Sequence, residues 1–276
     1  MTPEASAQLR RAFARRILAQ AGIDDARIEQ VFAQTAREKF AGPPPWFVAG
    51  FGGYAGTRDI AELYSNCLVA IDPARGINIG EPALHARCLH ELALQEGETV
   101  LHVGAGVGYY TAMLAWLVGA VGRVFGYEID SEFAARASEN LRSLRNVTIE
   151  ARSGISENLP QADAIYVNAG ALEPYAGWRR RLRPGGRLLF PLEAPHSVGA
   201  MLLVRRADSE TRWPARFIFP VSFIACVAQR DRAAERRLAE RFADESWRTV
   251  RSLRFDARDA TCWFAGPDWW LSAAPP

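Results

Sequence analysis

The sequence predicts an α/β fold with a doubly wound, mostly parallel seven-stranded sheet, and three observations support this prediction. Short apolar segments alternate with segments of helical period between residues 99 and 191, a pattern typical of a parallel sheet covered by helices. Two longer strand-like segments follow within residues 200–224, and they predict an antiparallel hairpin at one edge of the sheet. The chain also has 276 residues, of which 49% are hydrophobic, and this is enough to build a large core.

The central elements follow from these local patterns. The expected strands are the seven apolar segments at residues 99–103, 123–128, 147–151, 162–167, 187–191, 200–205 and 216–224. Helical periodicity predicts helices at residues 109–117, 131–144, 175–182 and 231–242. Ser131 is the expected N-cap of the second of these helices.

The first forty residues predict two further helices, separated by Gly22. Asp24 is expected to cap the second helix, because an aspartate side chain can accept hydrogen bonds from the first free backbone N–H groups. The inward-facing residues should be Ala12, Ile17 and Leu18 in the first helix and Ile28, Val31 and Phe32 in the second.

Two aromatic regions lie outside this pattern. After the run Gly42-Pro43-Pro44-Pro45, which ends helix formation, residues 46–57 read as a long ordered loop. This loop could close over a substrate, and its aromatic residues are Trp46, Phe47, Phe51 and Tyr54. For the second cluster we favour packing onto the core or a partner subunit over a role as a lid; its members are Trp263, Phe264, Trp269 and Trp270.

These features divide the chain into three expected regions. Residues 1–75 form an N-terminal helical and aromatic-loop region, and residues 226–276 form a C-terminal helix and aromatic extension. Residues 76–225 between them form the expected cofactor-binding core, with an antiparallel hairpin at its edge.

Composition excludes several classes of protein. A net charge of +2 argues against a nucleic-acid partner, for which a basic excess is expected. No apolar run approaches the roughly 20 residues that a membrane span requires, so no membrane partner is expected. The N-terminus lacks the apolar region of a signal peptide and is expected to be a surface helix rather than a transit peptide. The four cysteines lie far apart and predict neither disulfides nor a metal site, which favours a cytoplasmic location.

The most informative motif is Gly104-Ala105-Gly106-Val107-Gly108, which lies between a predicted strand and a predicted helix. Its glycines allow a sharp turn and a close approach of the backbone to a ligand. Ligands of open α/β sheets bind at the carboxyl ends of the strands, so this turn predicts a cofactor site. Tyr109 stands where the dinucleotide fingerprint requires its third glycine, which favours S-adenosylmethionine over a dinucleotide.

Glu128, at the end of the next predicted strand, is the expected partner of the cofactor's ribose. A carboxylate in this position can accept hydrogen bonds from both ribose hydroxyls. Dinucleotide and S-adenosylmethionine sites share this feature, so Glu128 does not by itself distinguish the two.

Together with the glycine motif, three further stretches carry a resemblance to the protein-L-isoaspartate O-methyltransferases, which are class I methyltransferases. These stretches are residues 76–86 (GINIGEPALHA), 163–171 (DAIYVNAGA) and 182–188 (LRPGGRL). The resemblance covers roughly residues 60–225. It implies a Rossmann-like methyltransferase fold, S-adenosyl-L-methionine as cofactor and a peptide or small-molecule methyl acceptor.

The resemblance also implies the residues of the cofactor site. Glu128 and Ile129 would contact the ribose and adenine, Ser153 and Gly154 the adenine edge, and Ser222 the cofactor from a late strand. Other members of the predicted site lie in the matching stretches, namely Ile77, Asn78, Ile79, His85, His102, Gly104, Ala105, Gly106, Tyr109 and Asn168.

The chain departs from the family pattern at three positions. Gly80 replaces a serine, so a hydroxyl donor at the acceptor site is missing. His102 replaces an acid that helps to hold the cofactor's ammonium group, and a neutral imidazole replaces it only in part. Ser153 replaces an aspartate on the adenine side and keeps a hydrogen-bonding group without the charge.

The expected reaction is O-methylation of a carboxylate. A carboxylate, with a pKa near 4, is ionised at neutral pH and needs no general base, whereas an amine or alcohol acceptor would need one. Glu81 is the candidate catalytic residue near the cofactor-side motif. The resemblance implies an isoaspartyl acceptor. The replacement of the serine by Gly80 leaves two alternatives, a specialised small-molecule acceptor and a cofactor-binding protein without catalysis, and a dehydrogenase is a more distant one.

Overall fold

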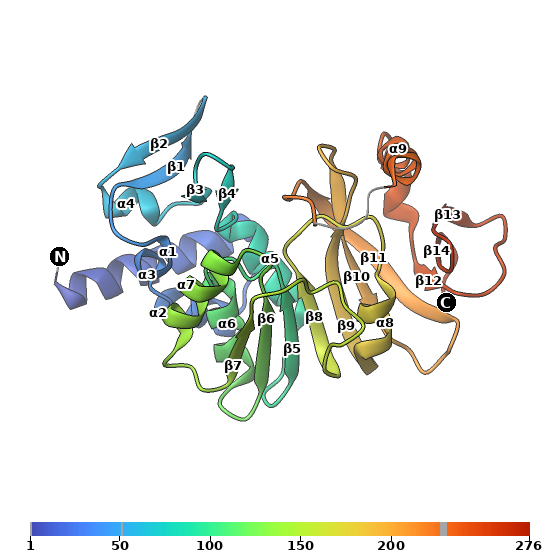
Figure 1. Cartoon of the computed structure of the whole chain (residues 1–276), viewed down its shortest axis with the longest axis horizontal. Helices are drawn as coiled ribbons and strands as arrows, with labels where there is room; N and C mark the ends of the chain where they lie inside the picture. The colour runs from blue at the N-terminus through green and yellow to red at the C-terminus, as the bar shows by residue number, and fades with distance from the viewer. Residues whose placement is uncertain (1, 51, 227–230) are drawn as a thin grey trace. The chain divides into compact units, whose positions relative to one another are not determined.

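The computed structural model describes residues 2–50, 52–226 and 231–276, and they form two compact units (Figure 1). Unit 1 comprises residues 1–98 and 105–152, and unit 2 comprises residues 99–104 and 153–276. None of the helices in the described ranges is both long and apolar enough to cross a membrane. Because unit 2 includes residues 99–104 and unit 1 resumes at residue 105, the chain crosses between the units inside the glycine motif, after Gly104.

Unit 1 begins with the helices α1 (Pro3–Ala21), α2 (Ala26–Gln34) and α3 (Arg37–Ala41). The rings of Phe13 and Tyr64 meet edge to face with centroids 5.3 Å apart. The predicted inward faces are largely confirmed, because Ile17, Leu18, Ile28, Val31 and Phe32 are buried. Ala12 is only half-buried, and Phe13 and Ala14 occupy the buried face of α1 instead.

The helix caps lie one residue from their predicted positions. Asp25, not Asp24, caps α2, and its Oδ1 accepts hydrogen bonds from the backbone N–H groups of Arg27 and Ile28. Asp130, not Ser131, caps α7 (Ser131–Leu141) in the same way. In both cases a side-chain oxygen must reach the N–H groups two and three residues on, and the neighbouring aspartate is the residue in that position.

Residues 46–57 form a β-hairpin, so the predicted long loop is wrong. Strands β1 (Trp46–Gly50) and β2 (Gly53–Thr57) pair antiparallel, with Trp46 opposite Thr57. The turn uses backbone that only glycine adopts easily, since Gly52 and Gly53 have φ of 91° and 127°. Phe51 lies outside the described residues. Tertiary pairing overrides the weak strand propensity of this glycine-rich segment.

The hairpin belongs to a small sheet in the order β2-β1-β3-β4, drawn in lighter blue and cyan in Figure 1. Its other strands are β3 (Val69–Asp72) and β4 (Ile77–Asn78), and the short helix α4 (Ile60–Leu63) precedes them. Unit 1 also contains α5 (Pro82–Leu92), α6 (Tyr109–Val118), β6 (Arg123–Tyr127), α7 and β7 (Val147–Glu150). Strands β6 and β7 are parallel, as predicted.

Unit 2 contains the other predicted strands: β5 (Thr99–Val103), β8 (Ala162–Val167), β9 (Leu182–Leu192), β10 (Gly199–Arg205) and β11 (Arg212–Val221). Strand β8 pairs parallel to both β5 and β9, and α8 (Ala176–Arg181) connects β8 to β9. Strands β9, β10 and β11 pair antiparallel, which is the predicted edge hairpin. The ends of β5, β8, β9 and β11 therefore point to one edge of this sheet, which we call the carboxyl edge.

The C-terminal region extends the sheet of unit 2. After α9 (Arg232–Arg241) and a 3₁₀ turn (Glu245–Thr249), the strands β12 (Ser252–Arg254), β13 (Cys262–Ala265) and β14 (Trp270–Ser272) continue from β11 in the order β11-β12-β14-β13. The prediction that the aromatic tail packs onto the core is confirmed within unit 2. All four of its aromatic side chains are buried, namely Trp263, Phe264, Trp269 and Trp270.

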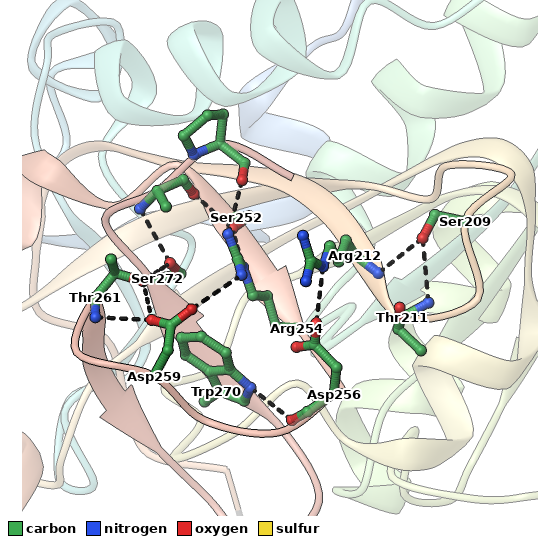
Figure 2. Close-up of polar contacts among 12 residues, drawn as sticks. Ser209, Thr211, Arg212, Ser252, Arg254, Asp256, Asp259, Thr261, Trp270 and Ser272 are labelled. Atoms are coloured by element: carbon green, nitrogen blue, oxygen red, sulfur yellow. Dashed lines mark hydrogen bonds and ion pairs between the residues drawn. The ribbon is translucent and has the colours of Figure 1, made fainter.

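A buried arginine holds this extension together (Figure 2). Arg254 stacks over the ring of Trp270 at 5.0 Å and donates hydrogen bonds to Ser252 Oγ at 3.0 Å and to the carbonyl of Pro275 at 2.8 Å. Its guanidinium also lies 3.5 Å from Asp259 Oδ2. These contacts give the planar, multiply donating guanidinium partners on several sides, and they fix the end of the chain to β12.

Candidate functional site

In unit 1 the glycine turn is anchored to the end of β6. The backbone N–H of Ala105 donates to the carbonyl of Tyr127 at 3.1 Å. Gly106 and Gly108 have φ of 55° and 91°, a region that favours glycine. A Cβ at Gly108 would lie 2.7 Å from Leu141, so this glycine allows close helix packing. A Cβ at Gly106 would meet nothing within 4 Å, so the space beside Gly106 is open and a ligand could lie against it.

Glu128 lies directly after β6 and is held by this turn. Its Oε2 accepts from the N–H of Gly106 at 2.7 Å, and its Oε1 accepts from the N–H of Asp130 at 3.0 Å. The residue is only 9% exposed. Each carboxylate oxygen keeps a further lone pair, so this fixed carboxylate can accept hydrogen bonds from two adjacent hydroxyl groups. Beside it, Ile129 is 52% exposed and offers an apolar surface.

Gly80, which stands in place of the family's serine, lies against His85. The His85 and Tyr110 rings stack with centroids 3.7 Å apart, and a Cβ at Gly80 would lie 2.2 Å from His85 Nε2. Gly80 also has a φ of 92°. The hydroxyl of Tyr110 donates to the carbonyl of Gly80 at 3.4 Å, and burial raises the pKa of that hydroxyl. Serine at position 80 is thus incompatible with this arrangement of His85.

Glu81 is fixed by an asparagine that the sequence analysis did not single out. Asn66 Nδ2 donates to Glu81 Oε1 at 2.5 Å, and Asn66 Oδ1 accepts from the backbone N–H of Ala83 at 2.9 Å. Asn66 therefore supplies the side-chain cap of α5 that Glu81 does not. Nearby, Asn78 Oδ1 accepts from the N–H of Gly80 at 2.9 Å, and the flanking residues Ile77 and Ile79 are half-buried and buried.

Tyr109 lies in the core of unit 1. Its ring meets that of Phe40 edge to face at a centroid distance of 5.4 Å, and the guanidinium of Arg37 lies 5.9 Å from the Tyr109 ring centroid. Burial raises the pKa of the Tyr109 hydroxyl, so it stays neutral. These contacts give Tyr109 a role in packing, and its contact with a cofactor stays a prediction.

In unit 2, His102 and Asn168 meet at the carboxyl edge. They lie at the ends of β5 and β8, and His102 Nε2 is 2.7 Å from Asn168 Nδ2. Burial lowers the pKa of His102 to about 3, so the ring is neutral and Nε2 accepts from the Asn168 amide. The ring also stacks parallel to that of Tyr166 at 5.5 Å. Asn168 Oδ1 is buried without a hydrogen-bond partner among the described residues, as expected of a group that binds a ligand.

The other predicted residues of unit 2 have different surroundings. Gly104 has a φ of 77°, and its Cβ would lie 3.2 Å from the carbonyl oxygen of Asn168. Ser153 Oγ accepts from the N–H of Ile155 at 3.1 Å, and the carbonyl of Gly154 accepts from Trp178 Nε1 at 2.8 Å. Ser222 follows β11 and is exposed.

Glu193 is a polar residue of the carboxyl edge that the sequence analysis missed. It lies directly after β9 and is only 3% exposed. The rule that ligands bind beyond the carboxyl ends of strands could have identified it, because it follows the predicted strand 187–191 by two residues. In the described part of the chain, no three histidine, cysteine or acidic residues meet in a group that could hold a metal ion.

The comparisons with known proteins agree with these features. Residues 14–231 match the family model described as protein-L-isoaspartate(D-aspartate) O-methyltransferase (PCMT). A protein-L-isoaspartate O-methyltransferase of Methylorubrum populi is 33% identical over 74% of this chain and 87% of its own length. A protein-L-isoaspartate O-methyltransferase 2 of an Anaeromyxobacter species is 31% identical over 81% of this chain and 84% of its own length.

A solved structure shows the same fold. It is a putative protein-L-isoaspartate O-methyltransferase of Plasmodium falciparum in complex with S-adenosyl-L-homocysteine, with a TM-score of 0.63 and 21% sequence identity. The match covers 78% of this chain and 97% of that chain. The predicted Rossmann-like fold, with its mostly parallel sheet, antiparallel edge and N-terminal helices, is therefore confirmed. By its match over residues 14–231, the chain belongs to the protein-L-isoaspartate(D-aspartate) O-methyltransferase family.

Proposed function

We propose that this protein is an S-adenosylmethionine-dependent protein-L-isoaspartate O-methyltransferase. The observation that carries the proposal is the fixed carboxylate of Glu128 on the glycine turn, in a chain that matches this family over residues 14–231. The relatives in Methylorubrum populi and Anaeromyxobacter carry the same activity in their names. Neither a specialised small-molecule acceptor nor a cofactor-binding protein without catalysis has comparable support.

The residues of unit 1 fit the nucleoside part of the cofactor. Glu128 is proposed to accept hydrogen bonds from the two ribose hydroxyls, and the exposed side chain of Ile129 to contact the adenine. The open backbone at Gly106 is proposed to lie against the cofactor. The remaining unit 1 members of the proposed site are Ile77, Asn78, Ile79, His85, Ala105 and Tyr109.

The residues of unit 2 fit a polar, hydrogen-bonding ligand. Asn168 Oδ1 is a buried acceptor without a partner among the described residues, and the neutral His102 holds the Asn168 amide in place. We propose that these two residues take over the part of the family's acid in binding the ammonium group. Gly104, Ser153, Gly154 and Ser222 complete the unit 2 part of the proposal.

When bound, the cofactor would supply an activated methyl group, carried on a sulfonium, for transfer to an acceptor carboxylate oxygen. The acceptor is ionised at neutral pH, with a pKa near 4, so this chain's residues need only bind and align it. Glu81, whose Oε1 accepts a hydrogen bond from Asn66 Nδ2 at 2.5 Å, stays the proposed catalytic residue.

Two measurements test the proposal. Titration calorimetry with S-adenosylhomocysteine should show binding, and transfer of labelled methyl groups should occur to an isoaspartyl peptide but not to the same peptide with ordinary aspartate. Absence of binding at millimolar ligand overturns the cofactor assignment. Labelling of small molecules from a metabolite extract, without labelling of the isoaspartyl peptide, overturns the assignment of an isoaspartyl acceptor.

A cytoplasmic location is part of the same proposal. Cys67, Cys88, Cys226 and Cys262 are all free thiols, which is usual for proteins of reducing compartments. Fractionation of cells that produce the full chain, followed by detection of the protein in the cytosolic fraction, checks this location.

A further inference from the structure

Glu193 lies among three chain segments at the carboxyl edge of unit 2. Its backbone N–H donates to the carbonyl of Ala171 at 2.9 Å, which ties it to the segment after β8. Its Oε1 accepts from the backbone N–H of Phe223 at 2.8 Å, which ties it to the segment after β11. The glycines Gly170 and Gly199 leave the space that it fills, because a Cβ on either would lie 2.2–2.3 Å from Glu193 atoms.

One oxygen of this carboxyl group has no hydrogen-bond partner in the part of the chain that the structure describes. Oε2 is buried and makes no hydrogen bond among the described residues. Buried polar groups are almost always hydrogen-bonded, and exceptions often mark functional positions. The segment that covers Glu193 is bound to Gly170, whose N–H donates to the carbonyl of Ile224 at 2.9 Å and whose carbonyl accepts from the N–H of Cys226 at 2.8 Å. Ser222, Ile224 and Ala225 of this segment are exposed. Access of a ligand to Oε2 therefore requires this segment to move away from Gly170.

The surroundings keep this carboxyl group neutral. Burial raises the pKa of Glu193 to about 8, against the opposing effect of the Phe223 N–H. Among the titratable groups of the adjoining segments, burial raises the pKa of the Cys226 thiol to about 12 and also raises that of the Tyr175 hydroxyl, so both are uncharged at neutral pH. Because Oε1 already accepts from the N–H of Phe223, the proton of Glu193 resides on Oε2, as an O–H donor without an acceptor among the described residues.

We infer that Glu193 is a binding residue for the methyl acceptor, and that its Oε2–H donates a hydrogen bond to the acceptor's carboxylate. This inference rests on the proposed function. A buried O–H donor at the carboxyl edge suits an anionic acceptor, since a neutral acid attracts a carboxylate whereas an ionised one repels it. Glu193 also provides the kind of hydroxyl donor that is missing at Gly80.

The inference predicts a pH dependence that a purely structural glutamate would not give. The donor exists below about pH 8 and is replaced by a repelling charge above it. The effect should appear mainly in KM for the peptide, because the hydrogen bond holds the ionised acceptor before methyl transfer and weakens as the carboxylate loses its charge in the transition state. In Glu193→Gln, an amide N–H can donate at any pH, so the dependence should disappear.

The experiment compares the wild type with Glu193→Gln, Glu193→Ala and the control Glu173→Gln, another unit 2 carboxyl, between pH 6.5 and 9.5. Formation of S-adenosylhomocysteine from an isoaspartyl peptide is followed, so that the stability of the methyl ester does not matter. Binding of S-adenosylhomocysteine by calorimetry shows that each variant is folded. The ratio of wild-type to Glu193→Gln kcat/KM removes the effect of every other ionising group.

In the expected result this ratio is constant below pH 7.5 and falls about tenfold per pH unit well above pH 8. Glu193→Ala should raise KM at pH 7 roughly tenfold or more, as for a lost hydrogen bond to a charged group, and Glu173→Gln should follow the wild type. A ratio that stays constant to pH 9.5 overturns this inference alone, even if Glu193→Ala fails to fold. A wild type that binds S-adenosylhomocysteine but methylates no isoaspartyl peptide overturns the proposed function and this inference with it.

Discussion

Two glutamates occupy the same kind of position in the two units, and their surroundings differ. Glu128 follows β6 in unit 1 and Glu193 follows β9 in unit 2, each as the first residue after its strand, and both are buried. Glu128 accepts a backbone N–H on each oxygen. Glu193 accepts one on Oε1 only, and its Oε2 has no partner among the described residues.

This difference in backbone donors separates the hydrogen-bonding roles that the two carboxyl groups can take. For Glu193, burial with a single backbone donor favours the neutral form. Glu128 is thus equipped to accept hydrogen bonds from hydroxyl groups. Glu193, whose pKa is raised to about 8, is equipped to donate one at neutral pH.

The largest effect is expected from removing the better-partnered carboxylate. Glu128→Ala deletes the proposed ribose acceptors and leaves the N–H groups of Gly106 and Asp130 without their partner. Affinity for S-adenosylhomocysteine should fall by roughly 100-fold, or about 3 kcal/mol, as measured by calorimetry. The control is Glu132→Ala, which removes an exposed carboxylate in the first turn of α7. Unchanged affinity in Glu128→Ala would remove Glu128 from the ribose site.

A second variant tests whether a hydroxyl group at position 80 can act as the hydrogen-bond donor that we assign to Glu193. Gly80→Ser restores the family's serine, but its Cβ would lie 2.2 Å from His85 Nε2 and its φ is 92°. Unfolding free energy should fall by about 2 kcal/mol, with no gain in methylation rate. Gly76 also has a positive φ, but a Cβ there would lie in open space. Gly76→Ser should therefore lower the unfolding free energy less than Gly80→Ser does. Equal stability losses in the two variants, measured by urea unfolding, would contradict the clash with His85.

The third effect is smaller and depends on pH. The pKa of Glu193 is about 8 in the folded protein against an ordinary value of 4.5. The folded state therefore binds the extra proton between these pH values, and its stability falls as the pH rises through this window. Relative to Glu193→Gln, the wild type should lose about 1 kcal/mol of unfolding free energy between pH 6 and pH 7. Parallel pH profiles of the two proteins in urea unfolding would show that Glu193 is ionised in the folded state.

Local sequence patterns were sufficient to predict much of this molecule. The alternation of residues 99–224 predicts the seven core strands, and the glycine motif and Glu128 stand at the ends of two of them; in the structure Gly106 N–H donates to Glu128. These features depend on residues close in sequence, where propensity and period decide the outcome. The hairpin of residues 46–57 was missed for the opposite reason, since its strands are held by pairing to each other and to β3.

The sequence by itself determined the family, the strand and helix order and the position of the glycine turn, because each is written in contiguous residues. Only the tertiary structure decided which polar atoms have partners. It showed that Gly80 is enforced by His85, that Asn66 fixes Glu81, and that Glu193 has a carboxyl oxygen without a partner among the described residues. Hydrogen bonding and burial depend on groups distant in the chain, and no local pattern records what surrounds a side chain.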